Sequence, residues 1–303
     1  MTGKGIMETF DYAQIMKPVP DFDPDTMRAA LDRSGFPSCE YAYANLQMWA
    51  EAFQTRCGIF RGQLYFHMSN IDELLFPCGE APSAEDLHIV SKGMRQAGFS
   101  GVIAHAPLES TRLPGLENFF RIEPMDDGND EYIYKTETLA GLHGSKLSKK
   151  RNLISQFKRL YPGYEIREIT PDSCSLVREL NGEWFRHHAD TQSIENEQKA
   201  IAAALSRYDE LGLHGIILLA EGRIQALAIF SPINRNSWTV HFEKACPECK
   251  GAAQVINQET ALRLVGRCEY INREQDLGIP GLRQAKQSYM PDRMLKDHLL
   301  IPK

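Results

Sequence analysis

The sequence predicts an α+β protein built from two halves that share one order of helices and strands. The chain has 303 residues, 43% hydrophobic and 24% charged, which is a soluble composition with room for two domains of about 150 residues. Alternating strand patterns are interleaved with helical patterns throughout, and the order in the second half repeats that in the first. This composition excludes disordered, collagen-like and small disulfide-bonded proteins.

The first half opens with two helical segments, residues 24–34 and 39–54, with Asp23 and Ser38 as N-caps. A β-meander follows, with two strands inside residues 57–67 and a third at 74–77. The remaining elements are a helix over 83–98 with a capping box, a strand over 101–105, a short helix over 114–119 and a strand pair within 120–134.

The second half repeats this order after an extra strand at 165–169. Its expected elements are helices near 172–188 and 194–211, a hairpin of strands 214–220 and 223–230 around Glu221-Gly222, a strand over 237–243, a helix over 252–267, a strand over 270–273, a turn and helix over 278–290, and a tail over 294–301 that closes the sheet.

This is the element order of a GNAT acyltransferase, whose mixed sheet separates between its fourth and fifth strands to admit an acyl donor. We expect three regions: a non-catalytic N-terminal GNAT-like domain over 1–136, a basic linker helix over 137–162, and a C-terminal GNAT-like domain over 163–303 that carries the cleft.

Charge and cysteine usage limit the function classes. The net charge of −6 argues against a general nucleic-acid binder, although a local basic patch remains compatible with it. The seven cysteines are odd in number and scattered, as in reduced cytoplasmic proteins. Only Cys246 and Cys249 have ligand-like spacing, and without a second pair they indicate a turn, so we expect no metal. The absence of a long apolar stretch and of a signal-peptide core predicts a cytoplasmic protein without membrane insertion.

Three strings of residues resemble the phosphatidylglycerol lysyltransferase C-terminal domain family, over the chain from about residue 38 to its end. They are Tyr132–Tyr134 leading to Lys149–Asn152; His241–Ala245 leading to Gln254–Glu259; and Ile271–Gly278 leading to Gly281–Arg283, Lys286 and Tyr289. The resemblance implies transfer of an acyl group to an amine or hydroxyl. In membrane-bound relatives the donor is an aminoacyl-tRNA and the acceptor a lipid headgroup. Without a spanning segment, this chain is expected to use a soluble acceptor or a peripheral encounter with lipid.

Residues Ser145–Arg159 contain six basic side chains and no acidic one. On a helix, Lys146, Lys149 and Lys150 are expected to share a face and to grip phosphates together with Arg151. Asn152 belongs to the same string. This segment is the predicted docking site for tRNA, and a solvated helix face is the alternative.

A His and a carboxylate alternate along the strand over 237–243. Alternation predicts His241 and Glu243 on one face, with Phe242 and Lys244 on the other. His241 and Glu243 together are candidates to relay a proton. Glu243 is the candidate general base on the acceptor, or else a salt-bridge partner that orients the site.

Polar residues also cluster after the strand over 270–273. The candidate catalytic residues there are Glu274, Asp276, Arg283, Lys286 and Tyr289, and Asn272 is a candidate binding residue. The cations would stabilise an oxyanion, and the phenol would protonate the leaving group. The alternative is a structural clamp in which Glu274 or Asp276 pairs with Arg283.

Acyl-CoA enzymes of this fold place a glycine-rich turn before the helix that corresponds to 252–267. Gly251 and Ala253 fit that turn, but Glu248 introduces a negative charge where the motif has Gln or Arg, which counts against acetyl-CoA. Together with the residues of the preceding paragraphs, the expected substrate-binding residues are Lys146, Lys149, Lys150, Arg151, Asn152, Lys244, Gly251, Asn257 and Asn272.

Together with these residues, the resemblance implies an aminoacyl transferase with an amine or hydroxyl acceptor, with no tightly bound cofactor and with aminoacyl-tRNA or acyl-CoA as co-substrate. The alternatives are an acyl-CoA-dependent N-acyltransferase and a non-enzymatic protein that binds tRNA or anionic lipid.

Overall fold

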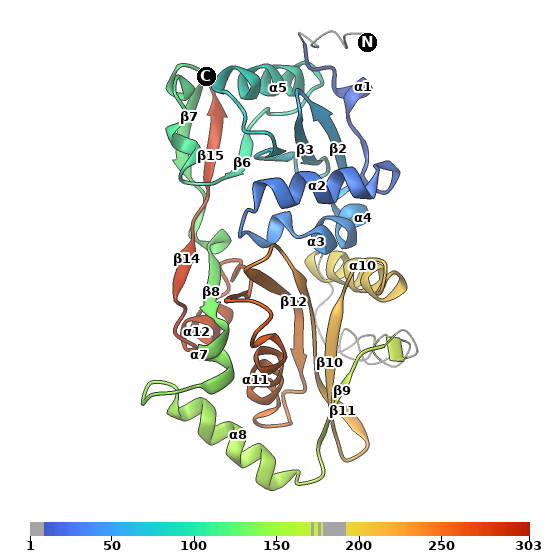
Figure 1. The fold of residues 1–303 in the computed structure, drawn as a ribbon, viewed down its shortest axis with the longest axis vertical. Helices are drawn as coiled ribbons and strands as arrows, with labels where there is room; N and C mark the ends of the chain where they lie inside the picture. Colours follow the sequence, from blue (N-terminus) through green and yellow to red (C-terminus); the bar gives the residue numbers. More distant parts are fainter. Residues whose placement is uncertain (1–8, 171–172, 175–176, 178–191) are drawn as a thin grey trace. The chain divides into compact units, whose positions relative to one another are not determined.

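The structure is a computed structural model that describes residues 9–170, 173–174, 177 and 192–303. The fold is α+β, with two mostly antiparallel sheets flanked by helices, as predicted (Figure 1). The chain forms two compact units: unit 1 is Met1–Phe36, Leu46–Asp130 and Lys296–Lys303, and unit 2 is Pro37–Asn45 and Glu131–Leu295. The region expected as a linker, 137–162, thus lies within unit 2, and each unit takes segments from separate parts of the chain.

Unit 1 is built on a sheet with the order β1-β2-β3-β4-β6-β15-β7, with β5 also paired to β3. Its strands are β1 Lys17–Pro18, β2 Thr55–Phe60, β3 Gln63–Met68, β4 Glu73–Leu75, β5 Cys78–Gly79, β6 Ile103–Ala106, β7 Phe120–Pro124 and β15 His298–Pro302. Its helices are α1 Tyr12–Ile15, η1 Val19–Asp21, α2 Pro24–Ser34, α4 Ala50–Phe53, α5 Ala84–Gln96, η3 Ser110–Arg112, α6 Leu116–Phe119 and η4 Asp127–Asn129. Leu87, Val90 and Met94 of α5 pack in one cluster with residues of the sheet.

Unit 2 is built on a sheet with the order β14-β8-β13-β12-β11-β10-β9. Its strands are β8 Glu131–Lys135, β9 Glu165–Glu168, β10 His214–Ala220, β11 Arg223–Pro232, β12 Ser237–Ala245, β13 Tyr270–Asn272 and β14 Arg293–Leu295. Its helices are η2 Cys39–Tyr41, α7 Thr136–Gly141, α8 Ser148–Leu160, α10 Gln192–Ser206, α11 Ala252–Leu264 and α12 Pro280–Gln287. The short helix α3, Tyr43–Met48, includes residues of both units.

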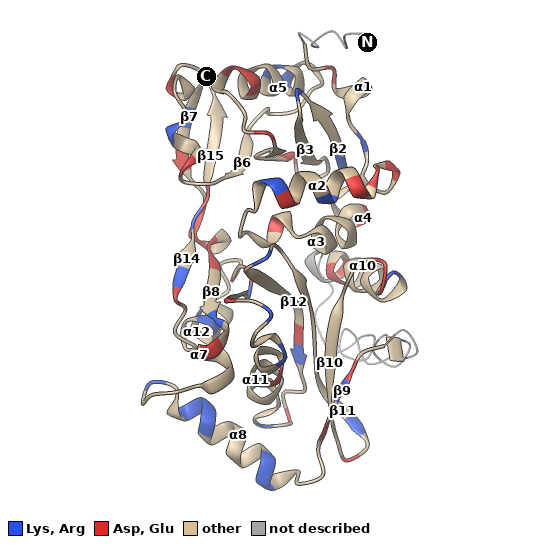
Figure 2. Ribbon diagram, viewed as in Figure 1, with Lys and Arg blue, Asp and Glu red and all other residues tan. Residues whose placement is uncertain are grey.

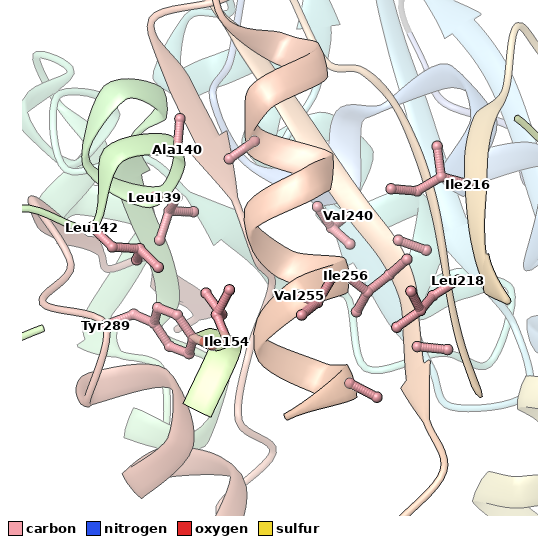
Figure 3. Packing of buried hydrophobic residues seen from close by; sticks show 14 of the residues in the cluster. Leu139, Ala140, Leu142, Ile154, Ile216, Leu218, Val240, Val255, Ile256 and Tyr289 are labelled. Atoms are coloured by element: carbon pink, nitrogen blue, oxygen red, sulfur yellow. The ribbon is translucent and has the colours of Figure 1, made fainter. Parts of the chain in front are cut away.

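Helix α11 forms the centre of the unit 2 core. Val255 and Ile256 on this helix belong to one buried cluster with Ile216, Leu218 and Val240 of the sheet (Figure 3). Burying such branched side chains contributes roughly 1.5–3 kcal/mol each. This cluster fixes α11 on one face of β12, which matters for the site described below.

Two sequence predictions for the strands and helices are wrong in detail. The expected helix over 39–54 is divided into η2, α3 and α4. The Glu131 carboxylate holds Ser38 and the Cys39 N–H at the start of η2, and the chain becomes extended at Ala42, which separates η2 from α3. The expected strand pair within 120–134 is not a pair: β7 joins β15, whereas β8 lies between β13 and β14.

The tail also differs from the prediction. Residues 294–301 were expected to close the sheet of the second half, but only β14 does so, while β15 lies between β6 and β7 in unit 1. The predicted helix over 172–188 lies outside the described residues. In the described ranges, no helix is both long enough and apolar enough to cross a bilayer.

Candidate functional site

The site lies where two parallel strands of unit 2 separate. Strands β12 and β13 pair only through Ser237–Thr239 and Tyr270–Asn272, and β12 then continues to Ala245 without β13, paired with β11 on its other edge. Beyond the last backbone pair, side chains connect the two segments. Glu274 accepts from Thr239 Oγ1 (3.1 Å) and His241 Nδ1 (3.2 Å), and Arg273 Nη2 donates to Glu243 Oε1 (2.8 Å).

A β-bulge at His241 changes which faces the β12 side chains occupy. Ile229 opposes Phe242 and Phe230 opposes Val240, which leaves His241 as an extra residue. Glu243 therefore lies with α11, whose Asn257 donates to it, whereas His241 bonds to Ser231. The prediction that His241 and Glu243 share a face is wrong, because the bulge breaks the two-residue alternation.

Glu243 organises a polar cluster on the α11 side. Its two carboxylate oxygens accept from Arg273 Nη2 (2.8 Å) and from Asn257 Nδ2 (3.2 Å). The other half of each partner is unused: Arg273 Nη1 and Asn257 Oδ1 are buried and have no hydrogen-bond partner in the described part of the chain. The site thus presents one unused donor and one unused acceptor, each held by the same carboxylate.

Aromatic rings and a lysine complete this cluster. The Arg273 guanidinium lies 5.1 Å from the centroid of the Tyr289 ring and 5.8 Å from that of Tyr134. Lys150 Nζ lies 4.1 Å from the Tyr289 centroid. Burial and the Arg273 charge lower the pKa of Lys150, while Glu243 opposes this shift. Burial lowers the pKa of Arg273, but Glu243 together with Tyr134 and Tyr289 outweighs that effect and holds the pKa above its usual value.

His241 sits in a separate chain of hydrogen bonds on the other side. Since the Glu274 carboxylate can only accept, Nδ1 carries the proton and Nε2 accepts from Ser231 Oγ (2.8 Å). A hydroxyl, an imidazole and a carboxylate in this order also occur in enzymes in which the imidazole activates the hydroxyl as a nucleophile and the carboxylate orients the imidazole. Here the Ser231 hydroxyl is used in its bond to His241, which fixes the histidine tautomer.

Asp276 and Arg283 form the structural clamp that was the alternative to a catalytic role. Arg283 donates to both Asp276 oxygens (2.7 and 3.0 Å), and the Tyr132 hydroxyl donates to Oδ2 (2.6 Å). The bond from Arg283 outweighs the cost of burial and lowers the pKa of Asp276 to about 2. This carboxylate is therefore a permanently charged anchor for the start of α12.

Lys286 and Tyr289 are both buried. Lys286 Nζ donates to the carbonyl oxygens of Arg273 (2.5 Å) and Gln275, and thereby fixes the loop that carries Arg273 and Glu274. Burial lowers the pKa of Lys286 to about 8. Burial also raises the pKa of the Tyr289 phenol, with Arg273 opposing the shift, so the phenol keeps its proton at neutral pH.

Asn272 contacts a buried carboxylate that the sequence did not single out. Its Nδ2 donates to Glu131 and to the Pro37 carbonyl oxygen, and Glu131 also accepts from Ser38 Oγ (2.5 Å). Its Oδ1 accepts from the Glu274 N–H (2.8 Å). Asn272 is thus used in holding the chain around Glu274, whose backbone is in the left-handed region (φ 57°).

The basic segment divides into side chains with different surroundings. Lys146 precedes α8, Lys149 is exposed on the helix, and Lys150 turns inward to Tyr289, so the three do not share one helix face. Arg151 donates to the carbonyl oxygens of Leu142 and Gly144 (2.7 Å to the latter). Figure 2 shows the blue basic residues along α8, where Asn152 is also exposed.

Two other predicted binding residues have structural partners. Lys244 Nζ bonds to Glu197 of α10 at 3.0 Å. Gly251 begins α11 with φ 96°, and a Cβ built there would lie 2.6 Å from the Leu153 carbonyl oxygen of α8. Glycine is required at this position because α8 crosses the start of α11 there. That close contact accounts for the glycine without any phosphate.

The two cysteines at 246 and 249 belong to a turn, as the sequence indicated. Cys246 Sγ donates to Glu248 Oε2 (3.0 Å), and Cys249 N–H donates to the Cys246 carbonyl oxygen (3.1 Å). Over the described residues, no three His, Cys, Asp or Glu side chains are grouped so that they could hold a metal ion.

Sequence reasoning missed Arg273 and Glu131. Arg273 lay inside a string that was recognised, but alternation drew attention to its neighbours Asn272 and Glu274. Its signal was a basic residue directly after the strand that borders the split in the sheet. Glu131 carried no signal, since it follows an acidic loop in the sequence.

Comparison with known proteins adds a family to this geometry. A family model described as phosphatidylglycerol lysyltransferase, C-terminal, matches residues 98–300. No match is found among curated proteins. A conserved protein of unknown function from Bacteroides thetaiotaomicron VPI-5482 is 30% identical, covers 95% of this chain and 99% of its own, and has a TM-score of 0.86.

Two more distant structures share the fold. The C-terminal domain (DUF2156) of a lysylphosphatidylglycerol synthetase from Agrobacterium fabrum is 14% identical, covers 91% of each chain and has a TM-score of 0.63. FemX is 10% identical, covers 92% of this chain and 96% of its own, and has a TM-score of 0.55. At these identities the likeness shows the tandem GNAT-like fold alone.

Proposed function

We propose that this chain, which belongs to the phosphatidylglycerol lysyltransferase C-terminal domain family, transfers an aminoacyl group from an aminoacyl-tRNA to a hydroxyl or amine acceptor. The family supports an acyl or aminoacyl transferase, and the geometry of unit 2 supports a reaction at the split between β12 and β13. The observation that carries the proposal is the pair of unused groups, Arg273 Nη1 and Asn257 Oδ1, at that split.

The chemistry of acyl transfer matches these groups. When the acceptor attacks the ester carbonyl, negative charge develops on the carbonyl oxygen, and Arg273 Nη1 is a fixed cationic donor for it. Asn257 Oδ1 accepts from the attacking hydroxyl or amine. In the proposed step Glu243, which holds both groups in place, also acts as the general base and takes the proton that the acceptor loses. Lys150, an ammonium with a lowered pKa, is the candidate proton donor to the departing 3′-oxygen of the tRNA.

The acyl-CoA alternative is less well supported. A CoA enzyme needs open backbone N–H groups at the glycine turn before α11, whereas Gly251 is in close contact with α8. The exposed lysines of the basic segment fit the phosphates of a tRNA, and the binding they supply should weaken with salt.

The test is transfer from charged tRNA by the purified protein, comparing Arg273→Lys with the parent. Lysine keeps the ion pair with Glu243 but removes the second guanidinium nitrogen, so kcat should fall roughly 100-fold or more, the usual loss of one oxyanion donor. Arg263→Lys is the matched control, because Arg263 pairs with Glu168 and Glu259 away from the split.

An unchanged kcat in Arg273→Lys would exclude the proposed oxyanion site. Acyl transfer from acyl-CoA, together with a clear thermal shift in the presence of CoA, would instead favour the CoA enzyme. Salt-dependent tRNA binding without any turnover would favour the non-enzymatic binding protein.

A further inference from the structure

The turn between β12 and α11 brings two cysteines together. The Cys249 N–H donates to the Cys246 carbonyl oxygen (3.1 Å), which closes a four-residue turn. The Cys246 N–H donates to the Gln225 carbonyl oxygen of β11 (2.8 Å), and the Cys249 carbonyl oxygen accepts from Ala252 at the start of α11 (3.0 Å). The first and last Cα atoms of such a turn are less than about 7 Å apart. A disulfide joins Cα atoms that are about 4.4–6.8 Å apart, so the backbone is already placed for one.

The two thiols of this turn differ in their access to solvent. Cys246 is partly exposed, and its Sγ donates to the exposed Glu248 carboxylate (3.0 Å). Cys249 is only 5% exposed and belongs to the buried cluster of unit 2, where the Tyr161 hydroxyl donates to its sulfur. A dissolved reagent can therefore reach Cys246, whereas Cys249 is placed to react with its neighbour in the turn.

Charge around the turn controls how readily these thiols react. Burial and the Glu248 carboxylate raise the pKa of Cys246. Burial also raises the pKa of Cys249, the hydrogen bond from Tyr161 opposes that shift, and a negative charge on Cys246 adds to it. Cys249 thus senses the charge of Cys246, as expected for neighbouring sulfur atoms. Because only the thiolate is nucleophilic, Glu248 slows the reaction of Cys246.

The remaining cysteines provide comparisons within the same chain. All seven cysteines lie in the described ranges, and four besides Cys249 are buried: Cys39, Cys57, Cys78 and Cys174. Cys268 is partly exposed, like Cys246, but its Sγ lies 3.5 Å from Thr136 Oγ1. Cys268 therefore tests whether partial exposure alone makes a cysteine of this chain react.

We infer that Cys246 and Cys249 are a redox modification site, at which a low-molecular-weight disulfide converts the two thiols into a reversible intrachain disulfide. The Cys246 thiolate attacks one sulfur of the oxidant, which gives a mixed disulfide and releases one thiol. Cys249 then loses its proton, attacks Cys246 Sγ and expels the second thiol. The two cysteines are oxidised, the oxidant is reduced to two thiols, and excess thiol reverses both steps. The inference does not depend on the proposed transfer.

The test treats the reduced full chain with oxidised glutathione, quenches the reaction with acid, alkylates the remaining thiols under denaturing conditions and measures intact and peptide masses. We expect the parent to lose the thiols of Cys246 and Cys249, to retain no glutathione, and to recover both thiols in dithiothreitol. Cys249→Ser should instead keep one glutathione on Cys246, because the second thiol is missing. Cys246→Ser should keep all its thiols, since Cys249 is buried.

Two further variants sharpen the test. Cys268→Ser is the matched control and should lose the same two thiols as the parent. Glu248→Gln should react faster than the parent, because loss of the carboxylate increases the thiolate fraction of Cys246. Circular dichroism of each variant checks that it is folded.

Four outcomes would overturn the inference. They are a parent that keeps all its thiols, a parent that retains glutathione as Cys249→Ser does, protection of the thiols in Cys268→Ser, and a dimer on a non-reducing gel that Cys246→Ser abolishes. The last result would assign Cys246 to a disulfide between two copies of the chain.

Discussion

Glu131 is a buried carboxylate held by three donors from two segments of unit 2. It accepts from the Ser38 hydroxyl, the Cys39 N–H and the Asn272 amide. Burial raises the pKa of Glu131 to about 7, although the bonds from Ser38 and Asn272 oppose the shift. Because the folded state then holds this proton more tightly than the unfolded chain, the protonated form stabilises the fold and the ionised form is costly.

Glu131 should therefore give the protein a stability that falls as the pH rises from about 4.5 to about 7. A shift of this size corresponds to about 3 kcal/mol. Glu131→Gln, which mimics the neutral acid, should remove most of this fall in urea unfolding measured at pH 5 and pH 8. Glu269→Gln, at an exposed position, should keep it. Equal pH dependence in Glu131→Gln and the parent would show that Glu131 does not titrate in this range.

At the same scale, the sequence predicted where polar residues gather better than it predicted their contacts. His241, Glu243 and Asn257 all lie beside the split between β12 and β13, and their roles in catalysis or binding stay predictions. The face of the sheet on which each side chain lies was not predictable, because the extra residue at the β-bulge reverses the alternation of side chains along β12. Residue types survive such local changes, whereas alternation does not.

At the scale of elements, the contact between α8 and α11 explains why residue 251 is a glycine. The Leu153 carbonyl oxygen of α8 approaches to 2.6 Å from a Cβ built on Gly251, and Phe157 Cβ to 2.9 Å. Gly266 offers a comparison, because it also has a left-handed backbone (φ 77°) but a Cβ there meets nothing within 4 Å. Substitutions at Gly266 and Gly251 therefore distinguish the cost of backbone strain alone from the added cost of a steric clash.

Gly266→Ala should cost only backbone strain, about 1 kcal/mol. Gly251→Ala should cost that amount plus about 1–3 kcal/mol, because α8 must move to admit the methyl group. Urea unfolding of both variants measures the difference. If the two variants lose the same stability, the α8 contact does not constrain this position. Gly251 would then again be a candidate for binding the phosphates of a co-substrate.

Elements marked by local chemistry were predicted well. Asp23 caps α2, Ser83 and Asp86 form the capping box of α5, and the Glu221-Gly222 turn joins β10 to β11. These signals act over two to four residues, so the sequence displays them directly. The short helix η2 at the start of residues 39–54 was not predictable, because Glu131, far away in the sequence, holds Ser38 and Cys39 there.

At the scale of the whole molecule, the repeat of element order predicted two GNAT-like units, but the course of the chain between them was not predictable. The chain returns to unit 1 after Leu295, so β14 and β15 lie in different sheets although only Lys296 and Asp297 separate them. Which strands become neighbours depends on contacts between residues that are far apart in the sequence, and no short sequence pattern reports such contacts.

This arrangement predicts the effect of removing the last strand. β15 pairs with both β6 and β7, and within the described residues β7 has no other strand partner. A chain ending at Leu295 keeps β14 but leaves the edge of β6 unpaired and β7 without a neighbour. Hydrogen exchange should therefore show faster exchange of the β6 and β7 amides, by 10-fold or more, while those of β10–β12 keep their protection.

The control for the truncation is Leu300→Ala, which keeps the backbone of β15 but empties its buried position in the unit 1 cluster. It should cost roughly 2–5 kcal/mol of stability in unit 1 while β7 stays paired. If truncation accelerates exchange equally in β10–β12, the two units unfold as one cooperative structure and β15 stabilises both. If only β6 and β7 respond, each unit depends on its own sheet, although the chain passes through both.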